Sequence, residues 1–351
     1  MTRCALLLRP SANRVYGASA PALALAELSV LDDHVLGGVV TEPAVARIGG
    51  VPYLVIELGA PLDRRTVEVL SNLSGLHALF EVQGDLLRPV EVAPLRRQDE
   101  DVTTIQRYVG KTNEALTHLL VNLALAAGPG AFDRALAGEA VRLLDPACGR
   151  GTTLNRAIVY GLDAVGVEHD KRDVEAYETF LLAWLKDKRL KHQVARERHR
   201  KGRATPASRC TVTYGGKDRA AHRVVEVIHA DAVEIRDHLP ARSVDALACD
   251  LPYGVQHGAS PAPGAVRRSP AELLDAALPA WRDVLRPGAG AAFAWNLRTL
   301  PRSDLVGLLE GHGFELCVPP EDARFEHRVD RSITRDVLLA RRGDPPSRES
   351  P

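Results

Sequence analysis

The sequence predicts an α/β protein in which a doubly wound sheet follows a small α+β unit. From residue 141 onward, short apolar segments alternate with amphipathic helical segments, the pattern of parallel strands with helices on both faces. In the first 95 residues, two apolar segments instead flank Gly49-Gly50, a pair typical of an antiparallel hairpin. The chain has 351 residues, enough for two domains with packed cores. We therefore expect two units of different architecture.

The N-terminal unit is expected to span residues 1–95. Its predicted elements, in chain order, are a strand at 4–10, a helix from Ser19 to Gly37, two strands around Gly49-Gly50, a helix at 63–72 and a strand at 76–82. The first helix is predicted from a start signal at Ser19 and Pro21 and from the pair Gly37-Gly38 at its end. The order strand-helix-strand-strand-helix-strand is that of a ferredoxin-like fold.

The larger unit is expected over residues 111–342, after a polar linker at 96–110, and opens with a helix from Lys111. Its predicted strands are VRLLD (141–145), AVGVE (164–168), VVEVIHA (224–230), VDALACD (244–250) and GAAFAWN (290–296), with helices from Thr152, Asp173 and Glu272. A helix at 304–310 and strands at 314–318 and 333–341 predict an antiparallel pair at the sheet edge. Residues 343–351 are rich in Pro and Ser and are expected to be disordered.

Charge is distributed unevenly along the chain. The 45 Lys and Arg residues balance the 45 Asp and Glu residues. The segment 186–223, however, holds 13 basic and 3 acidic residues, a local net charge of +10 that leaves −10 on the rest. Such a segment is commonly a solvated excursion, but it also suits an electrostatic platform for a polyanion. Both interpretations stay open, and the zero net charge does not exclude a nucleic-acid partner.

The composition excludes several classes of protein. Apolar residues make up 45% and charged residues 26%, as in ordinary globular proteins. The five cysteines form no CxxC pair and no Cys/His spacing of a metal site, so we expect reduced thiols and no metal. The apolar run after Cys4 is too short for a signal peptide, and no run reaches membrane-spanning length. We expect a soluble, cytoplasmic protein without a membrane partner.

The stretch LLDPACGRGTTL (143–154) places a glycine-bearing turn between a strand ending at Asp145 and a helix. Gly149 and Gly151 let a ligand approach the backbone, and the helix N-terminus offers free N–H groups. Glu168, at the end of the next strand, can accept both hydroxyls of a ribose. The spacing is not G-x-G-x-x-G, and Asp145 would repel a pyrophosphate, so a dinucleotide is disfavoured. A ligand with an amino-acid ammonium group, such as S-adenosylmethionine, suits Asp145 better; the alternative is an ordinary strand-turn-helix.

A second signal, DLPYGVQHG (250–258), directly follows an apolar strand. The carboxylate of Asp250 can accept one N–H of a planar amine, a backbone carbonyl can accept the other, and Tyr253 can stack on the ring. This arrangement would aim the nitrogen at an incoming electrophile. The alternative is a Pro-Tyr-Gly turn after a strand.

The charged segment 325–336 also has two interpretations. It could contact substrate phosphates, or it could be an edge strand whose charged side chains prevent pairing with another chain.

DPACGRGTTL and DLPYG resemble motifs I and IV of class I S-adenosylmethionine-dependent N-methyltransferases. With the helix KTNEALTHLLVNLAL before them, they are most similar to THUMP-associated tRNA guanine-N2 methyltransferases, over roughly residues 104–340. The resemblance implies the class I methyltransferase fold. It also implies which residues bind the cofactor: Asp145, Ala147, Gly149 and Gly151 for the methionine part, Glu168 for the ribose and Asp231 for the adenine. The target amine would be held by Asp250, Leu251, Pro252 and Tyr253. Leu251 departs from the DPPY form of motif IV, and the N-terminal unit is shorter than a complete THUMP arrangement.

The expected function is therefore S-adenosylmethionine-dependent methylation of an exocyclic amine of a nucleobase, guanine N2 in tRNA, with RNA as partner and the N-terminal unit as its recognition module. One alternative is a DNA adenine-N6 or cytosine-N4 methyltransferase, which would flip its base from a duplex. Another is a non-catalytic RNA-binding adaptor that keeps the fold. A protein-glutamine methyltransferase is disfavoured, because that group typically carries Asn where Asp250 stands.

Overall fold

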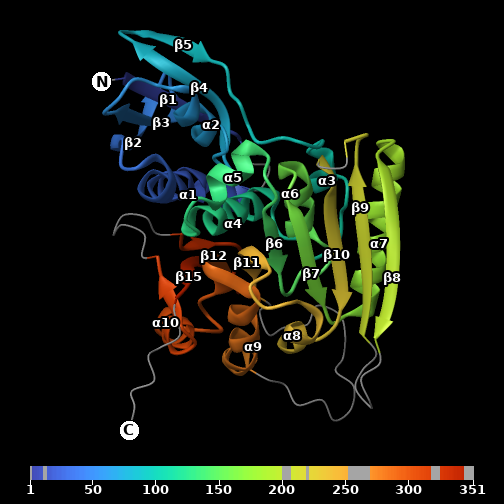
Figure 1. Cartoon of the computed structure of the whole chain (residues 1–351). Helices are drawn as coiled ribbons and strands as arrows, with labels where there is room; N and C mark the ends of the chain where they lie inside the picture. The colour runs from blue at the N-terminus through green and yellow to red at the C-terminus, as the bar shows by residue number, and fades with distance from the viewer. Residues whose placement is uncertain are drawn as a thin grey trace.

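A computed structural model of the chain describes residues 2–10, 14–199, 207–218, 221–251, 269–317 and 325–343 (Figure 1). Two of the residues expected to hold the target amine, Pro252 and Tyr253, lie outside the described residues, as does the predicted tail after Gly343. The described residues form two sheets, one from strands within residues 2–90 and one from strands within residues 142–342.

The N-terminal unit contains a five-stranded antiparallel sheet with the order β2-β3-β1-β4-β5. Its elements are β1 (Thr2–Leu8), α1 (Arg14–Leu31), η1 (Asp32–Leu36), β2 (Val40–Ile48), β3 (Val51–Leu58), α2 (Arg64–Leu70), β4 (Leu76–Gln83) and β5 (Leu86–Val90). The β2–β3 hairpin turns at Gly49-Gly50, where both φ angles are positive (57° and 81°), as a tight hairpin turn requires. The sequence did not predict β5.

A buried polar group joins this unit to the second one. Glu27 on α1 is fully buried and accepts hydrogen bonds from the amide and hydroxyl of Ser74 and from Nδ2 of Asn122. Asn122 lies on α4 (Glu114–Ala127), the first long helix of the second unit, and its Oδ1 accepts from the hydroxyl of Tyr160. Since buried polar groups are costly unless paired, this network fixes how the two units pack.

The second sheet has the order β13-β15-β12-β11-β6-β7-β10-β9-β8, with β14 paired to β15. Its strands are β6 (Arg142–Asp145), β7 (Asp163–Glu168), β8 (Lys191–His199), β9 (Ala207–Gly215), β10 (Arg223–His229), β11 (Val244–Asp250), β12 (Leu285–Asn296), β13 (Phe314–Leu316), β14 (His327–Arg328) and β15 (Thr334–Arg342). The five central strands, β12-β11-β6-β7-β10, are parallel, and both flanks are antiparallel. The expected α/β fold with an antiparallel edge is confirmed, as a mixed sheet.

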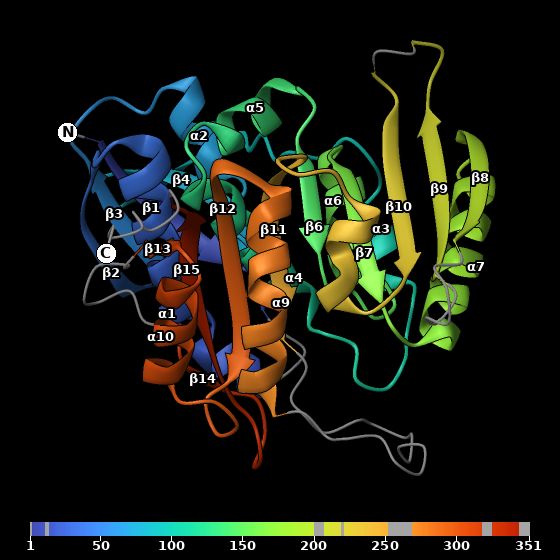
Figure 2. The ribbon, with the colours of Figure 1, turned by 60° about the horizontal axis from the view of Figure 1, so that its bottom comes forward.

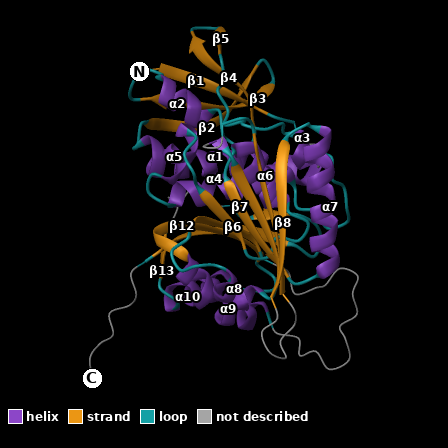
Figure 3. Ribbon diagram, turned by 45° about the vertical axis from the view of Figure 1, so that its right-hand side comes forward, coloured by secondary structure: helices purple, strands orange, loops and turns teal. Residues whose placement is uncertain are grey.

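Helices cover both faces of this sheet, as Figures 1 and 3 show. They are α3 (Asp101–Thr104), α4, α5 (Ala131–Ala137), α6 (Thr152–Tyr160) and α7 (Lys171–Asp187), followed by η3 (Ala232–Glu234), α8 (Ile235–His238), α9 (Pro270–Val284) and α10 (Arg302–Gly311). Buried residues of α4, α6 and α7 share one core with the N-terminal unit, and those of α9 and α10 share the core of the opposite face. Because β6 lies between β7 and β11, the winding reverses there, and crevices at such switch points bind ligands.

The first helix of this unit begins later than predicted. The sequence predicts its start at Lys111, but α4 begins at Glu114. Asn113 has an extended backbone, and its side chain accepts hydrogen bonds from the amides of Ala115 and Leu116, so it caps the helix. Thr112 therefore lies outside the helix.

No single helix among the described residues is long and apolar enough to span a membrane. Helices α4 and α5 pass that test only as a pair, and the pair is bent by 112°.

Candidate functional site

Three acidic residues end three neighbouring parallel strands. Asp145 is the last residue of β6, Glu168 of β7 and Asp250 of β11. Because β6 pairs with β7 on one side and with β11 on the other, the three carboxylates lie along one edge of the sheet. This is the carboxyl edge at which open α/β sheets bind their ligands.

The glycine turn follows Asp145 and leads into α6. The amide of Ala147 donates to Oδ1 of Asp145 at 3.1 Å, which closes the turn onto the strand end. Gly149 has φ +51°, and a Cβ there would meet no atom of the described residues within 4 Å, so a ligand has room beside it. Gly151 has φ +76°, and a Cβ there would lie 2.3 Å from the ring of Tyr177. The left-handed backbone favours glycine at both positions, and at Gly151 core packing against Tyr177 requires it as well.

Asp145 is almost completely buried, and burial raises its pKa to about 7. Hydrogen bonds from Thr153 and from the amide of Ala147 oppose this rise, while the neighbouring carboxylates of Asp250 and Glu168 add to it. A cationic group bound beside Asp145 would favour its ionised form. The residue is thus suited to hold an ammonium group.

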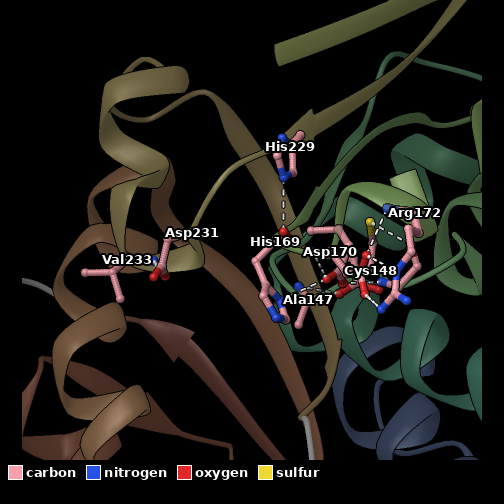
Figure 4. Close-up of polar contacts among 11 residues, drawn as sticks. Ala147, Cys148, His169, Asp170, Arg172, His229, Asp231 and Val233 are labelled. Carbon is pink, nitrogen blue, oxygen red and sulfur yellow. Dashed lines mark hydrogen bonds and ion pairs between the residues drawn. The ribbon is translucent and has the colours of Figure 1, made fainter. Parts of the chain in front are cut away.

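Glu168 is held in place by the turn itself. Its Oε2 accepts the amide of Gly149 at 3.0 Å, and its Oε1 accepts the amide of Asp170 at 2.8 Å and Nδ1 of His169 at 2.9 Å (Figure 4). Burial would raise the pKa of Glu168, but these hydrogen bonds outweigh it and hold the pKa below its usual range. A carboxylate has about four acceptor positions, so an ionised, oriented Glu168 can still receive hydroxyl donors.

Asp231 lies further from the turn, as Figure 4 shows. It precedes η3, and its Oδ1 accepts the amide of Val233 at 3.0 Å. It follows β10, the strand next to β7, so it is at the same edge of the sheet as Glu168. The side chain is exposed and can reach a ligand lying over these strand ends.

Asp250 is held by two residues that the sequence analysis did not connect with it. Its Oδ2 accepts the hydroxyl of Thr112 at 2.9 Å and a guanidinium N–H of Arg335 at 3.2 Å. Burial raises the pKa of Asp250, and Arg335 and Thr112 oppose that rise. Leu251, expected beside the target amine, has its side chain in the core, and its amide donates to the carbonyl of Ala294 at 2.8 Å.

Tyr108 and Arg150 also support the glycine turn, and the sequence does not predict the contacts of either residue. The hydroxyl of Tyr108 lies 2.9 Å from Oγ1 of Thr152, the first residue of α6. The guanidinium of Arg150 stacks over the Tyr108 ring at 5.0 Å and pairs with Asp173 at 2.8 Å. Tyr108 belongs to the polar segment 96–110, whose composition carries no signal for such a contact.

The cysteines beside the two motifs have packing roles. All five cysteines are buried, and Cys148 lies against Gly166 of β7, where a Cβ would be 2.6 Å from its sulfur. Burial raises the thiol pKa of both Cys148 and Cys249, which disfavours a reactive thiolate. In the described part of the chain no three His, Cys, Asp or Glu side chains gather as metal ligands.

The basic segment 186–223 runs from the end of α7 through the β8–β9 hairpin to the first residue of β10, and the hairpin widens the sheet (Figure 2). Several of its cations have partners: Lys188 with Asp99 and Asp101, Arg196 with Glu178, Arg209 with Glu226, and Arg223 with the carbonyls of Gly138 and Gly161. Lys191 and Arg198 on β8 are exposed, and no ion pair joins them to a described residue. Part of the local charge therefore stabilises the fold.

The chain matches no family model, and no curated protein matches it at a significant level. Its backbone is similar to solved methyltransferase structures. A candidate RNA methyltransferase from Pyrococcus horikoshii is 13% identical, with a TM-score of 0.38, over 70% of this chain and 96% of that one. An S-adenosylmethionine-dependent methyltransferase from Methanosarcina mazei is 15% identical, with a TM-score of 0.35, over 58% and 93%.

The 1,6-didemethyltoxoflavin-N1-methyltransferase of Burkholderia thailandensis, solved with S-adenosylhomocysteine, is 13% identical, with a TM-score of 0.36, over 63% of this chain and 79% of that one. These are similarities of backbone at low identity.

Proposed function

We propose that this protein is an S-adenosylmethionine-dependent methyltransferase that acts on an exocyclic amine of a nucleobase, guanine N2 in tRNA. The observation that carries the proposal is the convergence of Asp145, Glu168 and Asp250 at the ends of three adjacent parallel strands, beside the open Gly149. An ammonium partner, a ribose partner and an amine partner are thereby available at one edge of the sheet.

The residues present fit the cofactor. Asp145 suits the ammonium of its methionine part, the space at Gly149 allows close approach to the backbone, and Glu168 suits the ribose hydroxyls. Ala147 and Gly151 complete the turn, and Asp231 lies where it can accept from the adenine amino group. When bound, S-adenosylmethionine supplies an electrophilic methyl group on a sulfonium.

The role of Asp250 is to orient the acceptor. Its carboxylate accepts an N–H of the amine, which turns the nitrogen lone pair toward the methyl carbon. No strong base is needed, because the nitrogen becomes acidic once the new N–C bond forms and the S–C bond breaks, and its proton then leaves to solvent. Pro252 and Tyr253 would complete this acceptor site.

The N-terminal unit supports an RNA substrate within this proposal. Its strand order β2-β3-β1-β4, with α1 and α2 and with β5 at the end of the sheet, supports the proposal that this unit is a ferredoxin-like module. We propose that it serves recognition of tRNA in the cytoplasm. A duplex DNA substrate would call for a different recognition element and for base flipping.

The variant Asp250→Ala tests the proposal. We expect transfer of tritiated methyl groups from S-adenosylmethionine to tRNA from gene-deleted cells to fall below detection. Cofactor binding, measured by calorimetry, should stay within about threefold, because Asp250 serves the acceptor and not the cofactor. Undiminished transfer by this variant would overturn the assignment.

Mass spectrometry of nucleosides from cells with and without the gene identifies the product. Loss of N2-methylguanosine from tRNA is the expected result. A change confined to DNA bases would favour the DNA alternative. A protein that binds no S-adenosylmethionine would be the adaptor.

A further inference from the structure

Asp250 is contacted by segments that are distant in the sequence. Thr112 precedes α4 and lies 138 positions away, and Arg335 on β15 lies 85 positions away. Both donate to the same carboxylate oxygen, Oδ2, at 2.9 Å and 3.2 Å. Two donors on one oxygen define the plane and the rotation of the carboxylate more closely than one donor does.

The guanidinium of Arg335 is itself enclosed. Its side chain is 8% exposed, and in the strand register Arg335 lies opposite Asn296 of β12 on one side and opposite His327 of β14 on the other. The ring of His327 is in edge contact with Tyr16 of α1, at 5.9 Å between centroids. Residues from both units thus surround this arginine. A buried guanidinium is costly unless a carboxylate balances it, so Arg335 and Asp250 depend on each other.

We propose, building on the proposed function, that Thr112 and Arg335 are the positioning residues of Asp250. Their two hydrogen bonds hold Oδ2, so that the carboxylate keeps one orientation toward the acceptor amine. Without either donor the carboxylate can rotate, and the nitrogen lone pair is then aimed less accurately at the methyl carbon.

The groups facing Asp250 determine how it titrates. Burial raises its pKa, Arg335, Thr112 and His327 all lower it, and the carboxyl group of Asp145 faces it from β6. Replacing Arg335 by a neutral residue therefore raises the pKa of Asp250. Because an ionised carboxylate accepts an N–H more strongly than a protonated carboxyl group does, methyl transfer should then decline at a higher pH as the solution is acidified.

The variants Arg335→Gln and Thr112→Val test the positioning role, with tritiated S-adenosylmethionine and tRNA from gene-deleted cells. We expect kcat to fall on the order of 10²-fold for Arg335→Gln and less for Thr112→Val, which is the scale of a misplaced catalytic group. The affinity for S-adenosylmethionine should stay unchanged, and Thr112→Ser should restore activity. The acidic limb of the pH profile should move to higher pH in both variants, and further in the arginine variant, because Arg335 lowers the pKa of Asp250 more than Thr112 does.

Arg341→Gln is the matched control. Arg341 lies on the same strand and pairs with Glu315 at 3.5 Å, away from Asp250. If it lowers kcat as much as Arg335→Gln does, or if the pH profiles coincide, Arg335 has only a structural role and the proposal fails.

A titration of ¹³C-labelled carboxylates by NMR makes the outcome independent of turnover. The Asp250 resonance, assigned with Asp250→Asn, should titrate at higher pH in Arg335→Gln than in the wild type. An unchanged titration would overturn the inference even in an active enzyme. A wild type that binds no S-adenosylmethionine would refute the proposed function instead, while the titration would still decide whether Arg335 controls Asp250.

Discussion

The strand ends around Asp145 and the β8–β9 hairpin are the two parts of the chain where charge is most concentrated, and they use it in opposite ways. Three carboxylates that lie far apart in the sequence meet at the edge formed by β6, β7 and β11. The cations of the segment 186–223 are close together in the sequence, but several of them are taken up by separate acidic partners on α3, α7 and β10 or by backbone carbonyls. Charge that is dense along the chain is thus not the same as charge that is available to a ligand.

We expect the largest effect from Asp145→Asn, on the affinity for S-adenosylmethionine. Loss of a buried charge that pairs with a cationic group costs about 2–5 kcal/mol, so affinity for S-adenosylmethionine should fall on the order of 10²-fold or more. In the wild type, where the pKa of Asp145 is raised to about 7, affinity should fall as pH decreases from 8 to 6, since the carboxylate takes up a proton. Calorimetry across this range measures both effects.

Asp163→Asn is the matched control for that experiment. Asp163 begins β7, at the opposite edge of the sheet, where it accepts the amide of Val224 at 2.8 Å. Its replacement should leave cofactor affinity within about threefold. Equal losses in the two variants would mean that the strand ends around Asp145 have no special role.

A smaller effect, on stability, separates the two glycines of the turn. Gly151→Ala should lower the free energy of unfolding by about 3 kcal/mol, because its Cβ would overlap the buried ring of Tyr177 in a left-handed backbone conformation. Gly149→Ala should cost only about 1 kcal/mol, since no atom opposes its Cβ. Urea unfolding measures both, and the reverse order would contradict the assigned packing.

The smallest effects are expected on the hairpin. Replacing both Lys191 and Arg198 by Gln should weaken tRNA binding modestly and reduce the slope of log affinity against log salt by about 2, if each contacts one phosphate. Arg196→Gln removes a cation that is paired with Glu178 at 3.2 Å, so the slope should hardly change. Its free energy of unfolding should fall by less than about 1 kcal/mol, as for exposed ion pairs.

Filter binding at several salt concentrations distinguishes these variants. If Arg196→Gln changes the slope as much as the Lys191 and Arg198 double variant does, cations with an acidic partner among the described residues contribute to tRNA binding as much as cations without one there. The ion pairs of the hairpin would then not reduce the charge that is available to a ligand.

Local signals were enough to place the carboxylates and the glycine turn. Asp145, Glu168 and Asp250 each follow an apolar strand, and parallel strands bring their carboxyl ends to one edge. The partners of Asp250 had no such signal. The sequence pattern places Thr112 inside a helix, whereas Asn113 caps α4 and leaves Thr112 outside it. Arg335 stands in a charged strand, and nothing in the sequence links it to Asp250.

The sequence by itself determined the class of fold, the chain order of the five parallel strands, and the residues at their ends, because periodicity and turn chemistry act over a few residues. It did not indicate β5, β8 or β9. Only the tertiary structure decided which side chains share a carboxylate, which cations already have partners, and how α1 and α4 are joined through Glu27 and Asn122. Those outcomes depend on contacts between segments up to 138 positions apart, and the balance of burial against pairing at such contacts is set by the packed fold.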